Sequence, residues 1–199
     1  MACRPLMTGR MKSAVLAALL CLPLSLSAGE HCPLLFAARG GDTRGSKADA
    51  LAIGWAFALP HRNVTISVRA DSGYDDYSIV TTYLMRRIGP STSKSAEVAQ
   101  TSYELPPSFD GSWILFDGLD LPAGEYWLVF ERPPHAERGE PEWIVSTIDG
   151  IHSTNGTKFL GTKYYSYVNH RTDYTPAAMY GQTTTLQGYQ VAVTGIPVE

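Results

Sequence analysis

Aromatic residues in the last third of the chain have the side chains best suited to bind a ligand. They include Trp143, Tyr165, Tyr167 and Tyr174, and amide, imidazole, guanidinium and carboxylate groups are interleaved with them at residues 169–182. Flat rings beside hydrogen-bonding groups suit stacking on a sugar and binding of its hydroxyl groups. The pattern is therefore compatible with a carbohydrate site. The favoured interpretation is that these tyrosines face the core and rim of the fold.

Three aspartates near one glycine could hold a cation. Asp71, Asp75 and Asp76 lie within six residues, and Ca²⁺ binds carboxylate oxygens at such short spacing. The spacing is not that of an EF-hand loop, so a solvated acidic turn is the favoured interpretation and a calcium site is the alternative. No other cofactor is expected. His152 and His170 have no partner at a zinc-binding spacing.

Acidic residues could also work in pairs, as in jelly-roll glycoside hydrolases. Glu125 and Glu131 share one face of a regular strand, but six residues at about 3.3 Å place them roughly 20 Å apart. Hydrolysis needs carboxylates about 5–10 Å apart. Glu142 and Asp173 are further candidates for such a pair. The sequence also lacks the G-x-S-x-G motif of a serine nucleophile. The sequence therefore favours a non-catalytic protein, with a jelly-roll glycoside hydrolase as an alternative.

Two strands and a tight corner are expected in the stretch SWILFDGLDLPAGEYWLVFERPP, residues 112–134. Pro122 presets φ and Gly124 can adopt positive φ, so the chain can reverse between the strands as a hairpin. Asp117 and Asp120 are expected to form local hydrogen bonds at the turn. The side chains that should be buried are Trp113, Tyr126 and Leu128, with Trp127 on the opposite face.

Alternating apolar and polar residues predict further short strands. These cover residues 51–59, 64–68, 78–87, 164–168 and 189–193. Residues 51–59 could instead form a helix of small residues, but the alternation and the stop at Pro60 favour a strand. The polar residues 91–102 indicate a surface excursion. Many short strands without a long helical stripe indicate an all-β fold, an antiparallel β-sandwich of jelly-roll type.

The N-terminal segment has the order of a Sec-type signal peptide. Three basic residues precede an apolar run at residues 14–24, and small residues follow up to Ala28. Translation could start at Met1 or Met11. No later segment approaches the roughly 20 apolar residues of a transmembrane helix. We expect a soluble mature chain, secreted to the extracellular space or the periplasm.

One domain is expected after the signal is removed. The predicted parts are a signal peptide at 1–28, an N-terminal lead-in with at most one short edge strand at 29–50, the β-sandwich at 51–194 and a C-terminal tail at 195–199. The mature chain would hold 13 basic and 19 acidic residues, a formal charge of −6. This charge argues against a nucleic-acid partner. Cys32 would be its single cysteine, which excludes an intramolecular disulfide.

The motif LFDGLDLPAGEYWLVFE at residues 115–131, with the alternation at 53–57 and the segment 83–89, resembles exported bacterial β-sandwich proteins of the PEP-CTERM type. Such proteins often end in an interchangeable C-terminal anchor, and VTGIPVE at residues 193–199 resembles the linker before it. The sequence contains no Pro-Glu-Pro motif with a following membrane segment, so anchoring by that route is not expected. The resemblance implies an exported β-sandwich and no catalytic residues.

The export signal, the all-β pattern and the lack of a catalytic motif together favour one function. We expect an exported, non-catalytic β-sandwich that acts by binding or structural association at the cell surface or in the matrix. A polysaccharide or a cell-surface component would be its partner. The alternatives are a carbohydrate-binding module that uses the late tyrosines, and the jelly-roll hydrolase.

Overall fold

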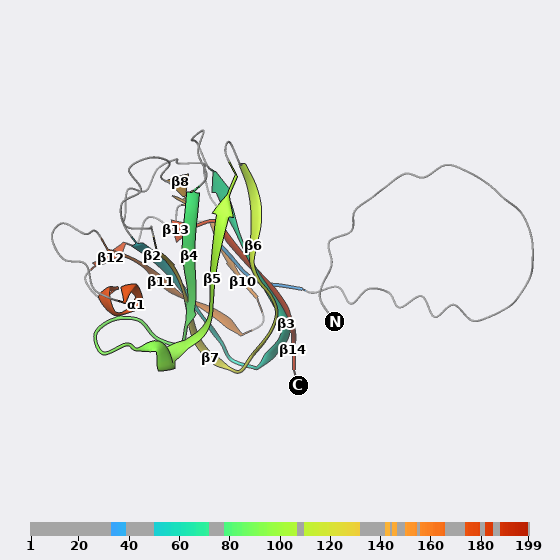
Figure 1. The fold of residues 1–199 in the computed structure, drawn as a ribbon. Coiled ribbons are helices and arrows are strands. Elements are labelled where there is room, and N and C mark those ends of the chain that lie inside the picture. The colour runs from blue at the N-terminus through green and yellow to red at the C-terminus, as the bar shows by residue number, and fades with distance from the viewer. Residues whose placement is uncertain are drawn as a thin grey trace, which may run out of the picture.

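Two antiparallel β-sheets packed face to face make up the protein (Figure 1). The computed structural model describes residues 33–38, 50–71, 78–106, 110–131, 142–143, 145–146, 150–154, 156–165, 174–179, 182–184 and 188–198. No helix within these ranges is long and apolar enough to cross a membrane.

Short strands account for nearly all of the regular structure. They are β1 (Leu34–Ala38), β2 (Ala50–Phe57), β3 (His61–Asp71), β4 (Ser78–Met85), β5 (Glu97–Leu105), β6 (Asp110–Leu121), β7 (Gly124–Glu131), β8 (Glu142–Trp143), β9 (Val145–Ser146), β10 (Ile151–Ser153), β11 (Thr157–Tyr165), β12 (Gln182–Thr184), β13 (Gly188–Tyr189) and β14 (Val191–Pro197). Two short helices, η1 (Lys94–Ala96) and α1 (Thr175–Ala178), lie between strands.

The strand order is that of a jelly roll. The first sheet runs β10-β1-β14-β3-β6, with β8 paired to β3, and the second runs β12-β11-β2-β7-β4-β5. If β1 to β7 and β14 are counted as eight successive strands, the two sheets contain the orders 1-8-3-6 and 2-7-4-5, which are those of a jelly roll. All pairings between the described strands are antiparallel. The predicted all-β sandwich is therefore confirmed.

The chain between β7 and β14 is an insertion into this eight-stranded scaffold. It supplies β10, which pairs with β1 at the edge of the first sheet, and β11 and β12, which extend the second sheet beyond β2. It also contains α1 and the two-stranded ribbon of β9 and β13. The late aromatic residues thus belong to an addition to the scaffold.

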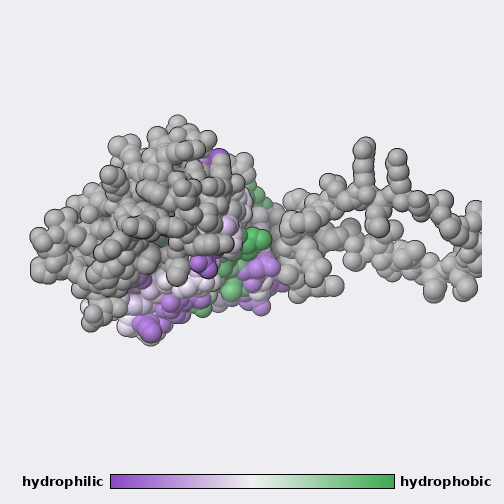
Figure 2. Space-filling model, turned by 45° about the horizontal axis from the view of Figure 1, so that its top comes forward, coloured by the Kyte–Doolittle hydropathy of each residue, from purple (hydrophilic) through white to green (hydrophobic). Residues whose placement is uncertain are grey.

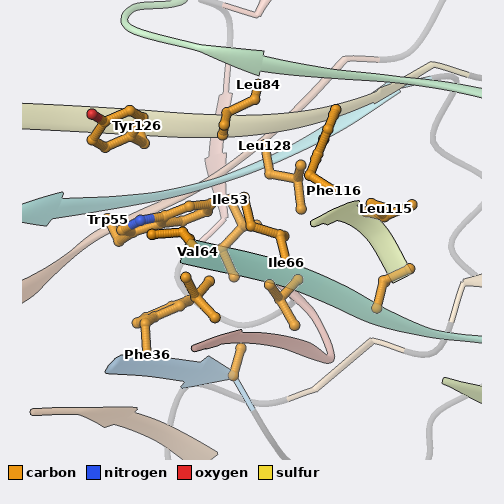
Figure 3. Packing of buried hydrophobic residues seen from close by; sticks show 14 of the residues in the cluster. Phe36, Ile53, Trp55, Val64, Ile66, Leu84, Leu115, Phe116, Tyr126 and Leu128 are labelled. Carbon is orange, nitrogen blue, oxygen red and sulfur yellow. The ribbon is translucent and has the colours of Figure 1, made fainter. Parts of the chain in front are cut away.

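Aliphatic side chains and a group of stacked aromatic rings fill the space between the sheets (Figure 3). Trp55 lies between Phe36 and Tyr126, with ring centroids 5.7 and 6.3 Å away. Tyr126 and Leu128 are fully buried in this core, as the sequence predicts, and Trp127 packs in a separate cluster. Trp113 is partly buried and stacks on Tyr103, 5.6 Å away. Strand β7 is apolar on both faces because one face packs in the core between the sheets and the other packs in the separate cluster.

The expected hairpin at residues 112–134 is wrong, because β6 and β7 belong to different sheets. The corner between them crosses from one layer to the other. The Tyr126 hydroxyl donates to the Pro122 carbonyl oxygen, and the Arg86 guanidinium lies 4.3 Å from the Tyr126 ring centroid and donates to the Ala123 carbonyl at 3.4 Å. A side chain of β7 and one directly after β4 therefore fix the corner.

Asp117 and Asp120 join two strands instead of forming the turn. An Asp117 carboxylate oxygen accepts a hydrogen bond from the Thr65 hydroxyl, and an Asp120 carboxylate oxygen accepts one from the Asn63 backbone N–H at 3.3 Å. The β3–β6 register shifts near Asn63, which has a φ of 54°. The two aspartates hold β6 against β3 where the ladder is irregular.

Two further expectations fail for reasons of strand position. The sequence predicts a surface excursion at residues 91–102, but β5 begins at Glu97 and forms the edge of the second sheet. Its outward residues Gln100 and Ser102 are exposed and polar, and this hides the strand pattern. Strand β1 lies between β10 and β14, so it is not an edge strand. The insertion supplies its second neighbour.

Candidate functional site

A second group of packed side chains covers the outer face of the second sheet. Tyr83 and Met85 of β4, Trp127 and Val129 of β7, and Met179 beyond α1 are buried together there, and Tyr174 packs against them. Cross-strand neighbours such as Tyr83 and Val129, or Met85 and Trp127, share this face. We call these residues, with Glu97, Glu131 and Lys163 at their border, the outer aromatic cluster.

Helix α1 brings part of the insertion onto this face (Figure 1). Thr175 and Met179 are buried, and the Gly89 backbone N–H donates to the Pro176 carbonyl at 2.9 Å. A proline in the first turn suits a helix start, since that position has no intrahelical partner for an N–H. The helix therefore ties the insertion to the chain between β4 and η1.

Two phenol–carboxylate hydrogen bonds form the polar part of the cluster. The Tyr83 hydroxyl donates to Glu131 Oε2 at 2.5 Å, and the Tyr174 hydroxyl donates to Glu97 Oε2 at 3.1 Å. The two tyrosine rings meet edge to face, with centroids 5.9 Å apart. Burial, and then the bond to its glutamate, raises the pKa of each phenol. Both tyrosines therefore remain protonated donors at neutral pH.

The Trp127 ring packs on the Gly54 backbone and lies near the Lys163 ammonium group. A Cβ atom on Gly54 would lie 2.7 Å from carbons of the Trp127 ring, so the ring rests directly on the glycine. On this face the Lys163 ammonium lies 5.7 Å from the Trp127 ring centroid, within cation–π range. Gly161, which pairs with Gly54, has open space where a side chain would be. The indole is thus held in place beside a small open area.

Stability should fall at alkaline pH because of these tyrosines. The folded phenols of Tyr83 and Tyr174 have a pKa raised above the usual 10.0, so the unfolded chain releases these protons first. Their contribution is present below pH 10 and is lost as pH rises further. We expect the double variant Tyr83→Phe/Tyr174→Phe to show a shallower loss of stability between pH 9 and 11 in denaturant titrations. An unchanged slope would contradict the assignment.

The residues predicted to bind a ligand lie in different parts of the fold. Tyr174 belongs to the outer aromatic cluster. Tyr165 ends β11 in the second sheet, in register with Ala50, whereas Trp143 is in β8 beside Ala70 of the first sheet. Tyr167 lies outside the described residues. The fold therefore places Trp143 and Tyr165 in opposite layers.

Two of the three predicted calcium ligands lie outside the residues that the structure describes. Asp71 ends β3, in register with Asp110 of β6 on one side and Glu142 of β8 on the other. Asp75 and Asp76 lie outside the described residues. Over the described part of the chain, no group of three or more His, Cys, Asp or Glu side chains could hold a metal ion.

Sequence reasoning missed most members of the outer aromatic cluster. No local pattern marks Tyr83, Glu97 or Lys163, and the sequence suggests Glu131 only as a possible member of a carboxylate pair. In the structure Glu125 is exposed and Glu131 accepts a hydrogen bond from Tyr83. One signal was available: β7 is apolar on both faces, which requires a cover on its outer side.

Hydrophilic and hydrophobic side chains lie side by side on part of the surface. Figure 2 shows a small hydrophobic area beside hydrophilic described residues on the face it presents. Among the described residues, the exposed large hydrophobic side chains are those of Leu59, Ile114 and Val198. Comparison of the chain with protein-family models, curated proteins and solved structures gives no match.

Proposed function

We propose that this protein is an exported, non-catalytic jelly-roll domain that acts by binding at the cell surface or in the matrix, with the outer aromatic cluster as its binding face. The observation that carries the proposal is the composition of that cluster. It combines the buried rings of Tyr83 and Trp127 with the partly exposed ring of Tyr174. Carboxylates and an ammonium group at its border are also partly exposed. This combination favours a carbohydrate, whose faces are apolar and whose edges carry hydroxyl groups.

The bonding of the carboxylates supports binding over hydrolysis. Glu97 and Glu131 each accept a hydrogen bond from a phenol, so neither is held ready to give a proton to a leaving group. Their β-strands are separated by β4, and Glu97 is in register with Met85 whereas Glu131 is in register with Thr81. A register offset of four residues corresponds to roughly 13 Å along the strands. The two backbone positions are therefore offset, and each carboxylate is engaged by a different phenol.

The test is retention on polysaccharides. The purified protein should be retained by at least one of a panel of insoluble cellulose, chitin and peptidoglycan. Lys163→Met should weaken this retention several-fold with little change in melting temperature, because Lys163 is partly exposed. Lys158→Met is the matched control, since Lys158 is an exposed lysine of the same strand outside the cluster.

Two outcomes would contradict the proposal. Absence of retention on the whole panel, or equal retention by both lysine variants, would remove the outer aromatic cluster as a carbohydrate site. Turnover of glycosides or esters that is abolished by Glu97→Gln or Glu131→Gln would show a hydrolase instead.

A further inference from the structure

A buried histidine lies at the end of the sandwich opposite β8. His61 is the first residue of β3, in register with Leu121 of β6 and Pro197 of β14, and its side chain is only 2% exposed. Its ring packs on Phe57, with centroids 4.3 Å apart. Three strands of the first sheet therefore meet at this residue.

Backbone hydrogen bonds close the chain over this end. Residues 58–60 connect β2 to β3, and the Ala58 N–H donates to the Gly156 carbonyl at 3.0 Å. The Val198 N–H donates to the Pro60 carbonyl at 2.9 Å. These bonds join the corner to the insertion on one side and to the end of β14 on the other. Movement of the corner would break both.

The surroundings of the His61 imidazole do not favour its protonated, positively charged form. Its Nδ1 is buried without a hydrogen-bond partner in the described part of the chain, as are Trp55 Nε1 and Thr157 Oγ1. Trp55 and Thr157 both neighbour Phe57, the first by ring contact and the second by register. An indole N–H can only donate, so it cannot accept a hydrogen bond from a protonated imidazole. The Thr157 hydroxyl could accept one, but no hydrogen bond joins it to His61.

The ionisable groups near His61 do not compensate such a charge. On the surrounding elements they are Arg62, Asp120, Glu125 and Lys158, which are exposed, and Arg86, which lies over the Tyr126 ring. Asp120 is engaged with the Asn63 N–H. The Tyr126 ring lies 5.5 Å from the ring of Phe57, on which His61 packs, so ring contacts link the Arg86 cation to His61. A second cation at His61 would be unfavourable.

We propose that His61 is an acid-sensitive lock: the neutral imidazole holds this end of the sandwich closed, and its protonation in mildly acidic surroundings loosens residues 58–60 and 197–198. Burial has the largest effect on the pKa of His61 and lowers it below the usual 6.5. A hydrogen-bonding interaction with the Leu59 backbone raises this pKa and so partly opposes the effect of burial. The unfolded or opened chain thus takes up the proton first. The contribution of the neutral imidazole to the stability of the closed state is complete above pH 6.5. It is lost as pH falls towards the pKa of His61 in the folded protein.

The direct test follows the wild-type protein from pH 7.5 to pH 5. Amide hydrogen exchange should show that the protection factors of Ala58 and Val198 fall several-fold, whereas those of Leu84 and Val129, in central strands, change little. The side-chain resonance of His61 should titrate below pH 6.5 in the same samples. Unchanged protection at Ala58 and Val198 would overturn the proposal.

Two variants of His61 and one control variant distinguish protonation of His61 from other effects of acid. His61→Phe keeps an aromatic ring against Phe57 but cannot take a proton, and His61→Gln is the neutral polar alternative should the first fail to fold. Either should abolish the acid-dependent loss of protection. His152→Gln removes an exposed histidine and should leave that loss intact. Persistence of the loss in both His61 variants would also overturn the lock.

Discussion

Leu128→Ala is expected to destabilise the protein by about 2–5 kcal/mol. Leu128 is fully buried in the centre of β7, in register with Ile53 on one side and Leu84 on the other, and all three are buried in the core. Truncation removes apolar contacts and leaves a cavity, because packed neighbours on both strands cannot collapse fully into the space. The measurement is the free energy of unfolding in urea at neutral pH.

Leu59→Ala is the matched control for this cavity. The same chemical change is made in the corner after β2, where the side chain is 50% exposed, so the loss should stay within about 0.5 kcal/mol. If Leu128→Ala costs as little as Leu59→Ala, then β7 does not lie between two packed layers.

Gly54→Ala is expected to cost about 1–3 kcal/mol, although alanine normally suits a strand better than glycine does. The added methyl group would lie 2.7 Å from the Trp127 ring, which is far closer than two carbon atoms approach without strain. The indole must leave its position on β2, and its contact with Lys163 and the packing of Met85 beside it would change with it. Chemical denaturation and tryptophan fluorescence both report this change.

A double-mutant cycle identifies the ring as the cause. Trp127→Leu removes the indole and will itself be destabilising, but in that background Gly54→Ala should cost much less than in the wild type. The difference between the two costs is the coupling free energy of the pair. Equal costs in both backgrounds would mean that the glycine is needed for its backbone and not for the close approach of Trp127.

The sequence by itself was sufficient for the fold class. Alternation in residues 64–68 and the apolar run around Leu128 predict strands, since side chains on a strand alternate between faces. The absence of a long helical stripe then leaves sheet-on-sheet packing as the way to bury them. Burial of Tyr126 and Leu128, with Trp127 on the other face, follows from the same period of two and is confirmed.

Only the tertiary structure decided how the strands are connected and what covers them. A corner containing Pro122 and Gly124 reverses the chain equally well within one sheet or between two, so local turn chemistry could not show that β6 and β7 lie in opposite layers. The outer aromatic cluster depends on Tyr83, Tyr174 and Trp127, which meet because a helix of the insertion packs on the far side of the second sheet. The hydrogen bond from the Tyr174 hydroxyl to Met85 in this cluster, for example, joins residues 89 positions apart. They are set by packing between layers, which a pattern of neighbours along the chain does not encode.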